Sequence, residues 1–310
     1  MVKAFLVGVA GDSGSGKSTF AAGVRRLFGK SEVATISLDD YHLLDRKERK
    51  RAGIVALDPR ANDLRKLAEH AEMLKDGRTV MKPRYDHSTG KIDPPAPFKP
   101  KRVVILEGLL PLHTRKLREL LDFTIYIDPD PEVKRFWKIK RDVGERGHSK
   151  EAVLRSIAER EPHYRRFITP QRRHAEIVVE IKKELAEERY QRGTPYWIRL
   201  IQRITGEKLT DIHLPLNLSR MCRSEGEELY FEYRKGLRGK QPVSKIEING
   251  MIPREMIAEV EGRIANLAGK PGAKVLPRSE RMVTEIGIAK LIIAWRVVER
   301  ILPQDHKPNL

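Results

Sequence analysis

A glycine-rich stretch near the N-terminus has residues of the right types and spacing to bind phosphate. It runs from Gly11 to Ser18 in the pattern G-x-x-x-x-G-K-S, and Thr19 follows it. An apolar run, residues 4–10, precedes it, and a helix-like segment, residues 20–27, comes after it. In this strand–loop–helix context the pattern forms a P-loop, whose backbone N–H groups bind phosphate oxygens. The stretch therefore predicts a nucleotide site, and a glycine-rich turn that binds nothing is the alternative.

Two residues of this loop have particular predicted roles. Lys17 is expected to reach the β- and γ-phosphates, and Ser18 is expected to bind Mg²⁺. The N-terminus of the following helix adds partial positive charge. We expect the whole stretch to line the nucleotide phosphates: Gly11, Asp12, Ser13, Gly14, Ser15, Gly16, Lys17, Ser18 and Thr19.

Acidic residues close two further predicted strands. Asp39 and Asp40 follow the β-rich run 33–38, and Glu107 lies at the end of the buried run 102–108. Ligands of parallel sheets bind beyond the carboxyl ends of the strands, so these acids should lie beside the P-loop. An acid in this position commonly holds Mg²⁺, directly or through water. Glu107 is therefore a predicted metal ligand, with a turn or helix-capping carboxylate as the alternative.

Two strongly basic segments are candidates for binding an anion. Residues 46–51 read R-K-E-R-K-R. Judged by charge alone, this segment is a solvated helix face; the functional alternative is a clamp that binds an anionic substrate. Residues 132–146 carry ion pairs at helical i,i+4 spacing, typical of a solvated helix. The functional alternative is a lid, about residues 132–170, whose cations close on a transferring phosphoryl group. Residues 82–91 predict a polar irregular loop, and the prolines of 94–100 predict an extended connector.

Composition restricts the classes of protein to consider. The chain has 310 residues, 40% of them hydrophobic, enough for a large core with a second domain. Its net charge of +18 suits phosphate-rich ligands and nucleic acid alike, but 6% aromatic content argues against a base-stacking surface. The single cysteine, Cys222, excludes an intrachain disulfide and fits a reducing cytoplasm. No run has the length of a membrane span.

The order of predicted elements indicates an α/β fold. Strand–helix–strand spacing at the N-terminus predicts right-handed βαβ units, and hence a P-loop NTPase-type, mostly parallel sheet flanked by helices. We predict a P-loop kinase core over residues 1–185. A C-terminal α+β extension over 186–310 is expected to pack on the core or to form an association surface. Further segments are predicted as strands or helices: 123–128, 175–181, 212–218, 229–233, 245–249, 253–267 and 284–302.

Several motifs, taken together, resemble the phosphoribulokinases of plants, cyanobacteria and archaea. They lie in residues 11–18, 39–46, 56–62, 82–90, 107–112 and 137–148. The resemblance is dense over residues 1 to about 185 and looser beyond. It implies ATP-dependent phosphorylation of D-ribulose 5-phosphate at its 1-hydroxyl, with Mg²⁺, in a homodimer that serves carbon fixation or a related sugar-phosphate pathway. No nucleic acid and no membrane is expected as a partner.

The resemblance also implies roles for individual residues. Asp39 resembles the catalytic base. The other implied positions are the sugar-phosphate ligands His42 and Arg46, with Arg49 beside them, the substrate contacts Tyr85 and His87, the metal ligand Glu107, and the lid residues Lys138, Asp142 and Arg146. Phosphoryl transfer depends on positioning and on charge neutralisation, which Lys17, Mg²⁺ and lid cations would supply.

One position departs from the family pattern. Plant and cyanobacterial relatives carry a cysteine for disulfide switching where this chain has Asp12. We therefore predict no intramolecular thiol–disulfide switch. Because an acid inside a phosphate cradle is electrostatically unfavourable, we expect the side chain of Asp12 to point outward.

Two other functions compete with this interpretation. A uridine-kinase-like nucleoside kinase shares the P-loop and the strand-end Asp39, but it gives no reason for the block Asp58–Asn62 or for the cations around His42. An ATP-regulated nucleic-acid-binding protein is suggested by the net charge of +18 alone. It predicts steep salt dependence of polynucleotide binding and no ADP release with a sugar phosphate.

Overall fold

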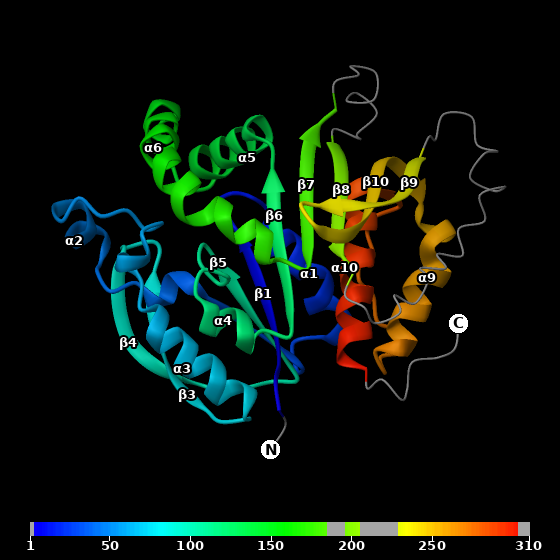
Figure 1. Cartoon of the computed structure of the whole chain (residues 1–310), viewed down its shortest axis with the longest axis horizontal. Coiled ribbons are helices and arrows are strands. Elements are labelled where there is room, and N and C mark those ends of the chain that lie inside the picture. Colours follow the sequence, from blue (N-terminus) through cyan, green and yellow to red (C-terminus); the bar gives the residue numbers. More distant parts are fainter. Residues whose placement is uncertain (1–2, 185–195, 205–228, 303–310) are drawn as a thin grey trace. The chain divides into compact units, whose positions relative to one another are not determined.

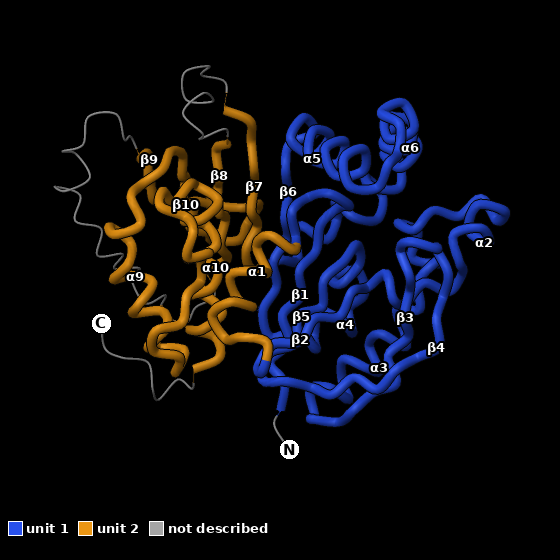
Figure 2. Tube along the Cα trace, turned by 180° about the vertical axis from the view of Figure 1, so that it is seen from behind, with its two compact units in different colours: residues 1–17, 31–175 blue, residues 18–30, 176–310 orange. Residues whose placement is uncertain are grey.

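The computed structural model describes residues 3–184, 196–204 and 229–302 (Figure 1). The chain separates into two compact units (Figure 2). The first consists of Met1–Lys17 and Ser31–Ala175, and the second of Ser18–Lys30 and Glu176–Leu310. The predicted division of the chain near residue 185 stays a prediction.

The first unit is built on a parallel sheet. Its strands are β1 (Phe5–Gly11), β2 (Val33–Ser37), β5 (Val103–Gly108) and β6 (Phe123–Pro129). β5 pairs with β2 and with β1, and β1 also pairs with β6, each in parallel register. The strands are nearly continuous apolar runs, because a parallel sheet is covered on both faces. This sheet and its helices confirm the predicted α/β fold.

The first unit contains five α-helices among its described residues. They are α2 (Arg46–Arg51), α3 (Leu64–Lys75), α4 (Arg115–Leu120), α5 (Pro131–Gly144) and α6 (Lys150–His163), with short 3₁₀ segments η1 (Leu38–Tyr41), η2 (Pro59–Ala61) and η4 (Thr169–His174), and a π-helical turn η3 (Tyr164–Ile168). Asp63 and Ser149 cap α3 and α6, as short polar side chains do at helix N-termini. α5 and α6 lie at the end of the sheet toward which β6 runs (Figure 1).

Residues 80–98 form a β-hairpin where the sequence predicted an irregular loop and a connector. β3 (Val80–Asp86) pairs antiparallel with β4 (Lys91–Phe98), and the register shifts between Lys82 and Arg84. The prediction was wrong because prolines in β4 were interpreted as excluding a strand. In a two-stranded sheet both strands are edges, and an edge strand tolerates proline because its outward N–H needs no partner.

The second unit contains an antiparallel sheet and three helices within its described residues. β8 (Tyr196–Arg203) pairs with β7 (Ile177–Lys183) and β10 (Gln241–Pro253), and β10 pairs with β9 (Leu229–Arg238) and β11 (Met282–Thr284). The helices are α9 (Arg254–Leu267) and α10 (Glu285–Ile301); all but the first residue of α1 (Lys17–Phe28) also belong here. This composition confirms the predicted C-terminal α+β region.

Two sequence predictions fall outside the described residues, the strand at 212–218 and the position of Cys222. Within the described part, none of the helices combines the length and the apolar character needed to cross a membrane.

Candidate active site

The P-loop joins β1 to α1 and has the backbone that its glycines permit. Gly14 and Gly16 have φ angles of +79° and +87°, a left-handed region that other residues rarely adopt. A Cβ at Gly14 would lie 3.2 Å from the Cβ of Lys138, and one at Gly16 would lie 3.1 Å from the Trp137 ring. The glycines therefore allow α5 to pack directly on the loop.

Lys17 lies inside this loop. Its amine donates to the carbonyl oxygens of Gly11 at 3.1 Å and Asp12 at 2.7 Å. Burial lowers the pKa of Lys17, although the negative charges of Glu107, Asp12 and Asp39 oppose the shift. The strand-end acids Glu107 and Asp39 thus act electrostatically on the P-loop lysine.

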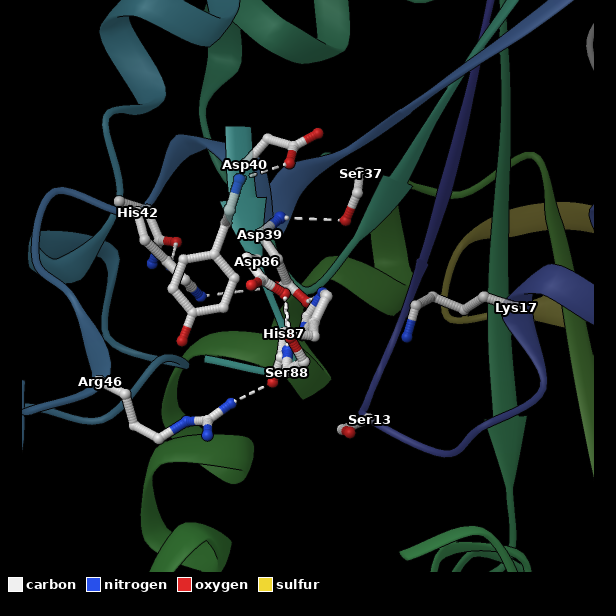
Figure 3. A network of polar contacts seen from close by, with 12 residues as sticks. Ser13, Lys17, Ser37, Asp39, Asp40, His42, Arg46, Asp86, His87 and Ser88 are labelled. Atoms are coloured by element: carbon white, nitrogen blue, oxygen red, sulfur yellow. Dashed lines mark hydrogen bonds and ion pairs between the residues drawn. The ribbon is translucent and has the colours of Figure 1, made fainter. Parts of the chain in front are cut away.

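Asp39 presents its carboxylate to two imidazoles. It lies in η1, where its N–H donates to the Ser37 hydroxyl at 3.3 Å. Its oxygens lie 3.7 Å from Nε2 of His42 and 3.4 Å from Nε2 of His87 (Figure 3). The Asp39 side chain is 32% exposed, so a ligand hydroxyl can reach it. A carboxylate that is accessible and held beside a P-loop is suited to general-base chemistry.

The basic segment 46–51 is attached to the β-hairpin rather than forming a purely solvated face. Arg46 donates from its guanidinium to the carbonyl oxygen of His87 at 2.5 Å (Figure 3), and its N–H donates to the carbonyl of Gly90 at 2.8 Å. Arg49 is buried, and its guanidinium donates to the Tyr85 hydroxyl at 2.8 Å. The predicted substrate residues of α2 and of the hairpin therefore form one group.

Asp40 connects the hairpin to the strand end that carries Asp39. Its carboxylate accepts hydrogen bonds from the amine of Lys82 and, at 3.0 Å, from the N–H of Tyr85. The sequence indicates a position beside the P-loop for Asp40 but not its contact with Lys82. The two residues are 42 positions apart in the chain, so no local pattern joins them. The alternation of charged and apolar residues around Lys82 could have indicated a strand there, but this segment was interpreted as a loop.

The predicted lid cations converge on one carboxylate. Asp142 is buried and lies 3.5 Å from the amine of Lys138, 2.8 Å from the guanidinium of Arg141 and 3.3 Å from that of Arg146. Arg141 also donates to the Ser13 hydroxyl at 3.1 Å. Burial lowers the pKa of Lys138 to about 8, helped by the nearby guanidinium groups and opposed by Asp142. Asp142 therefore holds three cations, of which Lys138 and Arg141 lie against the P-loop.

The side chain of Asp12 points toward α5 and α6 rather than to solvent. Its side chain is buried, and its oxygens lie 3.2 Å from the amine of Lys134 and 3.3 Å from the guanidinium of Arg160. The N–H of Ser13 donates to it at 2.7 Å. Burial alone would raise the pKa of Asp12, but the two cations and this hydrogen bond outweigh it and hold the pKa below its usual value. The acid is tolerated because cations of α5 and α6 neutralise it.

The predicted metal ligands fit a hard cation by their chemistry. Glu107 is a carboxylate, partly exposed at the end of β5, and Ser18 is a hydroxyl that follows Lys17 at the start of α1. Oxygen donors of this kind, completed by phosphates and water, are those that Mg²⁺ prefers. Ser15 adds a buried hydroxyl that lacks a hydrogen-bond partner among the described residues. Ser18 and Thr19 belong to the second unit, so the chain alone places them after Lys17.

Comparison with known proteins assigns the chain to a family. A model of the "Phosphoribulokinase / Uridine kinase family" matches residues 6–186, and the chloroplastic phosphoribulokinase of Spinacia oleracea is 35% identical over 293 residues, covering 86% of this chain and 72% of that protein. The chain belongs to the phosphoribulokinase/uridine kinase family. This confirms the resemblance found in its motifs.

Other members of the phosphoribulokinase/uridine kinase family differ in the extent of the match. The phosphoribulokinase of Synechocystis sp. is 50% identical over 176 residues, which cover 57% of this chain and about half, 53%, of that protein. A uridine kinase of Clostridium perfringens is 34% identical over 185 residues, 58% of this chain. The solved phosphoribulokinase of Rhodobacter spheroides covers 97% of this chain at 18% identity with a TM-score of 0.61, and shows the same fold.

Proposed function

We propose that this protein transfers the γ-phosphoryl group of ATP to the 1-hydroxyl of D-ribulose 5-phosphate, giving D-ribulose 1,5-bisphosphate and ADP. The observation that carries the proposal is the group formed by Asp39, His42, His87 and the guanidinium groups of Arg46 and Arg49. A base lies there beside cations suited to an acceptor that carries its own phosphate. The similarity to phosphoribulokinases over most of the chain supports the same substrate.

Different residues of the site have separate roles in the proposed phosphoryl transfer. Asp39 accepts the proton of the 1-hydroxyl as that oxygen attacks the γ-phosphorus. The P-loop backbone, from Gly11 to Thr19, and Lys17 bind the phosphates of ATP. Lys138 and Arg146, both held by Asp142, neutralise the charge on the transferring group.

The acceptor is recognised by residues of α2 and of the hairpin. Arg46 and Arg49 supply guanidinium groups, which match the geometry of a phosphate. Tyr85 lies between two imidazoles, with ring centroids 5.0 Å from His42 and 5.2 Å from His87. These rings form a wall beside the Asp39 carboxylate. Substrate hydroxyls would contact this wall.

Ser18 and Glu107 would hold Mg²⁺ together with the phosphates. The bound ion neutralises charge on the β- and γ-phosphate oxygens. We further propose that the protein acts as a homodimer in the cytoplasm, in carbon fixation or a related sugar-phosphate pathway, that nucleic acid is not a partner, and that residues 186–310 pack on the core or form the association surface. Light scattering coupled to size-exclusion chromatography tests the dimer.

A direct assay tests the proposed reaction. ADP release is measured with MgATP and ribulose 5-phosphate, beside uridine and a control without acceptor. The proposal is supported if ADP is released with ribulose 5-phosphate as acceptor but not with uridine. It is refuted if ADP is released with uridine but not with ribulose 5-phosphate. Asp39→Asn should lower kcat by about 100-fold or more, the usual contribution of a general base, with ATP affinity nearly unchanged. An equal loss of ATP affinity would contradict the assignment of the base.

A nucleoside kinase is the second candidate, because the uridine kinase of Clostridium perfringens is 34% identical and 88% of it is covered. Uridine carries no phosphate, and this function leaves Arg46 and Arg49 without a ligand. Arg46→Ala separates the two: a lost phosphate contact should raise KM for ribulose 5-phosphate and leave any activity on uridine unchanged.

A further inference from the structure

The block from Asp58 to Asn62 pairs with the segment that carries His42. Asn62 and His42 form an antiparallel backbone bridge, and the N–H of Leu43 donates to the carbonyl of Ala61 at 2.9 Å. The turn itself is fixed by Asp58, whose carboxylate accepts from the N–H of Arg60 at 2.9 Å. The block is therefore joined through its backbone to the segment that carries His42.

The side chain of Asn62 has only one orientation that satisfies its surroundings. Its amide nitrogen donates to two backbone carbonyls, those of Ala56 at 3.0 Å and of Asp58 at 2.8 Å. In the flipped orientation the amide oxygen would face both carbonyls, and buried acceptors would oppose each other. The amide oxygen must therefore face Nδ1 of His42, from which it lies 2.8 Å away.

This contact determines the tautomer of His42. An amide oxygen only accepts hydrogen bonds, so Nδ1 of the imidazole must carry the proton. In the neutral ring Nε2 then has a free lone pair. The nearest carboxylate to this atom is that of Asp39, at 3.7 Å, which is also an acceptor. Nε2 of His42 and the carboxylate of Asp39 are therefore two neighbouring acceptors, which a hydrogen-bond donor beside them would satisfy. A ligand hydroxyl is such a donor.

We propose that Asn62 is a positioning residue: it fixes His42 in the Nδ1–H tautomer, so that Nε2 accepts a hydrogen bond from a hydroxyl of the acceptor sugar. The identity of this sugar rests on the proposed function. The assignment also refines the role of His42, which recognises a hydroxyl rather than the phosphate of the substrate. The Tyr85 ring, perpendicular to His42 at 89°, restricts rotation of the imidazole.

The surroundings of His42 keep its ring neutral. Burial lowers the pKa of His42, and Arg49 and His87 act in the same direction, whereas Asp39 and the hydrogen bond that His42 donates to Asn62 oppose them. Protonation would place an N–H on Nε2 and turn it toward the carboxylate of Asp39. The base would then be engaged by His42 instead of by substrate, so activity should fall on the acid side.

The tautomer is measured directly in the unmodified chain. Protein labelled with ¹⁵N at histidine is examined by long-range ¹H–¹⁵N correlation at pH 8.5, and the loss of signals in His42→Gln assigns the ring. We expect a protonated Nδ1 and an unprotonated Nε2 in His42. A protonated Nε2, or an even mixture of tautomers, overturns the proposal without reference to any assay of activity.

Variants connect the tautomer to turnover. Asn62→Ala and Asn62→Asp both lose the two contacts to backbone carbonyls, but only the aspartate keeps an acceptor at Nδ1 and adds a charge that raises the pKa of His42. We expect Asn62→Ala to lower kcat/KM for ribulose 5-phosphate about tenfold at every pH, because misplaced contacts are costly, with KM for ATP unchanged. Asn62→Asp should retain the tautomer of His42. It should also move the acid limb of the pH profile, the range in which kcat/KM falls as pH decreases, to higher pH.

Asn249→Ala removes another buried asparagine, whose amide donates to the carbonyl of Tyr196 at 2.8 Å, and it should change stability without moving the tautomer or the pH profile. Equal losses in both Asn62 variants, with an unmoved acid limb, would show a merely structural role and refute the proposal. If the wild-type chain does not phosphorylate ribulose 5-phosphate, the proposed function fails, and the ¹⁵N measurement still decides the tautomer.

Discussion

Replacing Asp12 by asparagine removes the charge that attaches α5 and α6 to the P-loop. The Asp12, Lys134 and Arg160 side chains are only 11%, 10% and 20% exposed, so Asp12→Asn leaves two cations poorly hydrated and unpaired. Breaking a buried ion pair from one side costs about 3–5 kcal/mol. The amide oxygen still accepts from the N–H of Ser13, and the cations retain some solvent. We therefore expect a loss of about 2–3 kcal/mol in the free energy of unfolding.

The measurement is urea unfolding followed by Trp137, which lies in α5 against Gly16. Trp197 and Trp295 are replaced by phenylalanine in the reference chain, so that the fluorescence reports on the first unit alone. A double-mutant cycle with Lys134→Met separates the pair from its surroundings. We expect a coupling free energy of about 1 kcal/mol or more, because the two side chains are in contact.

A matched control and the pH dependence sharpen this test. Asp76 pairs with Arg78 on the surface, where both side chains are more than half exposed, so Asp76→Asn should have little effect. Because the pKa of Asp12 is lowered by folding, its contribution is complete above the unfolded pKa of about 4 and is lost as pH falls through the folded pKa. A change below about 0.5 kcal/mol at pH 7, or additivity in the cycle, would refute the role of the ion pair.

Two further substitutions test the neighbouring parts of the site. Since the pKa of Lys138 is about 8, kcat/KM for ATP, which reports on the free enzyme, should fall as pH rises through 8. Lys138→Arg should remove this fall at high pH because arginine stays charged. Superimposable pH profiles of the variant and the wild-type chain would contradict this role of Lys138. Gly90→Ala should raise KM for ribulose 5-phosphate about tenfold, because a Cβ there would lie 2.7 Å from that of Arg46, which must move. Gly53→Ala is the control: its φ of +63° carries the same backbone strain, but no atom lies within 4 Å of the added methyl group, and an equal effect on KM would rule out the contact with Arg46.

The parts of the fold that could be predicted are those set by local pattern. The P-loop follows from glycine spacing between an apolar run and a helix, and α3 from its period and from the Asp63 cap. The hairpin β3–β4 could not be predicted, since its prolines are tolerated only because both strands are edges of a two-stranded sheet. Edge status depends on which strands pair, and no single segment contains that information.

The candidate site shows the same division between local and distant information. Asp39 and Glu107 were predicted because strand ends in a parallel sheet meet at one edge. The partners of Asp12 were not, because Arg160 lies 148 positions away in the chain. The role of Asn62 depends on two backbone carbonyls that determine how its amide is turned, and residue types do not record such orientations.

These ion pairs also explain how an acid can occupy a phosphate-binding loop. The carboxylate of Asp12 is matched by Lys134 and Arg160, and Lys17 binds the carbonyl of the same residue, so the cations near the loop outnumber its one acid. Asp12 therefore does not leave an uncompensated negative charge in the loop, which would oppose the binding of an anionic nucleotide. The charge of Asp12 is directed at α5 and α6 through Lys134 and Arg160, so the P-loop itself holds in place the helix that bears Lys138.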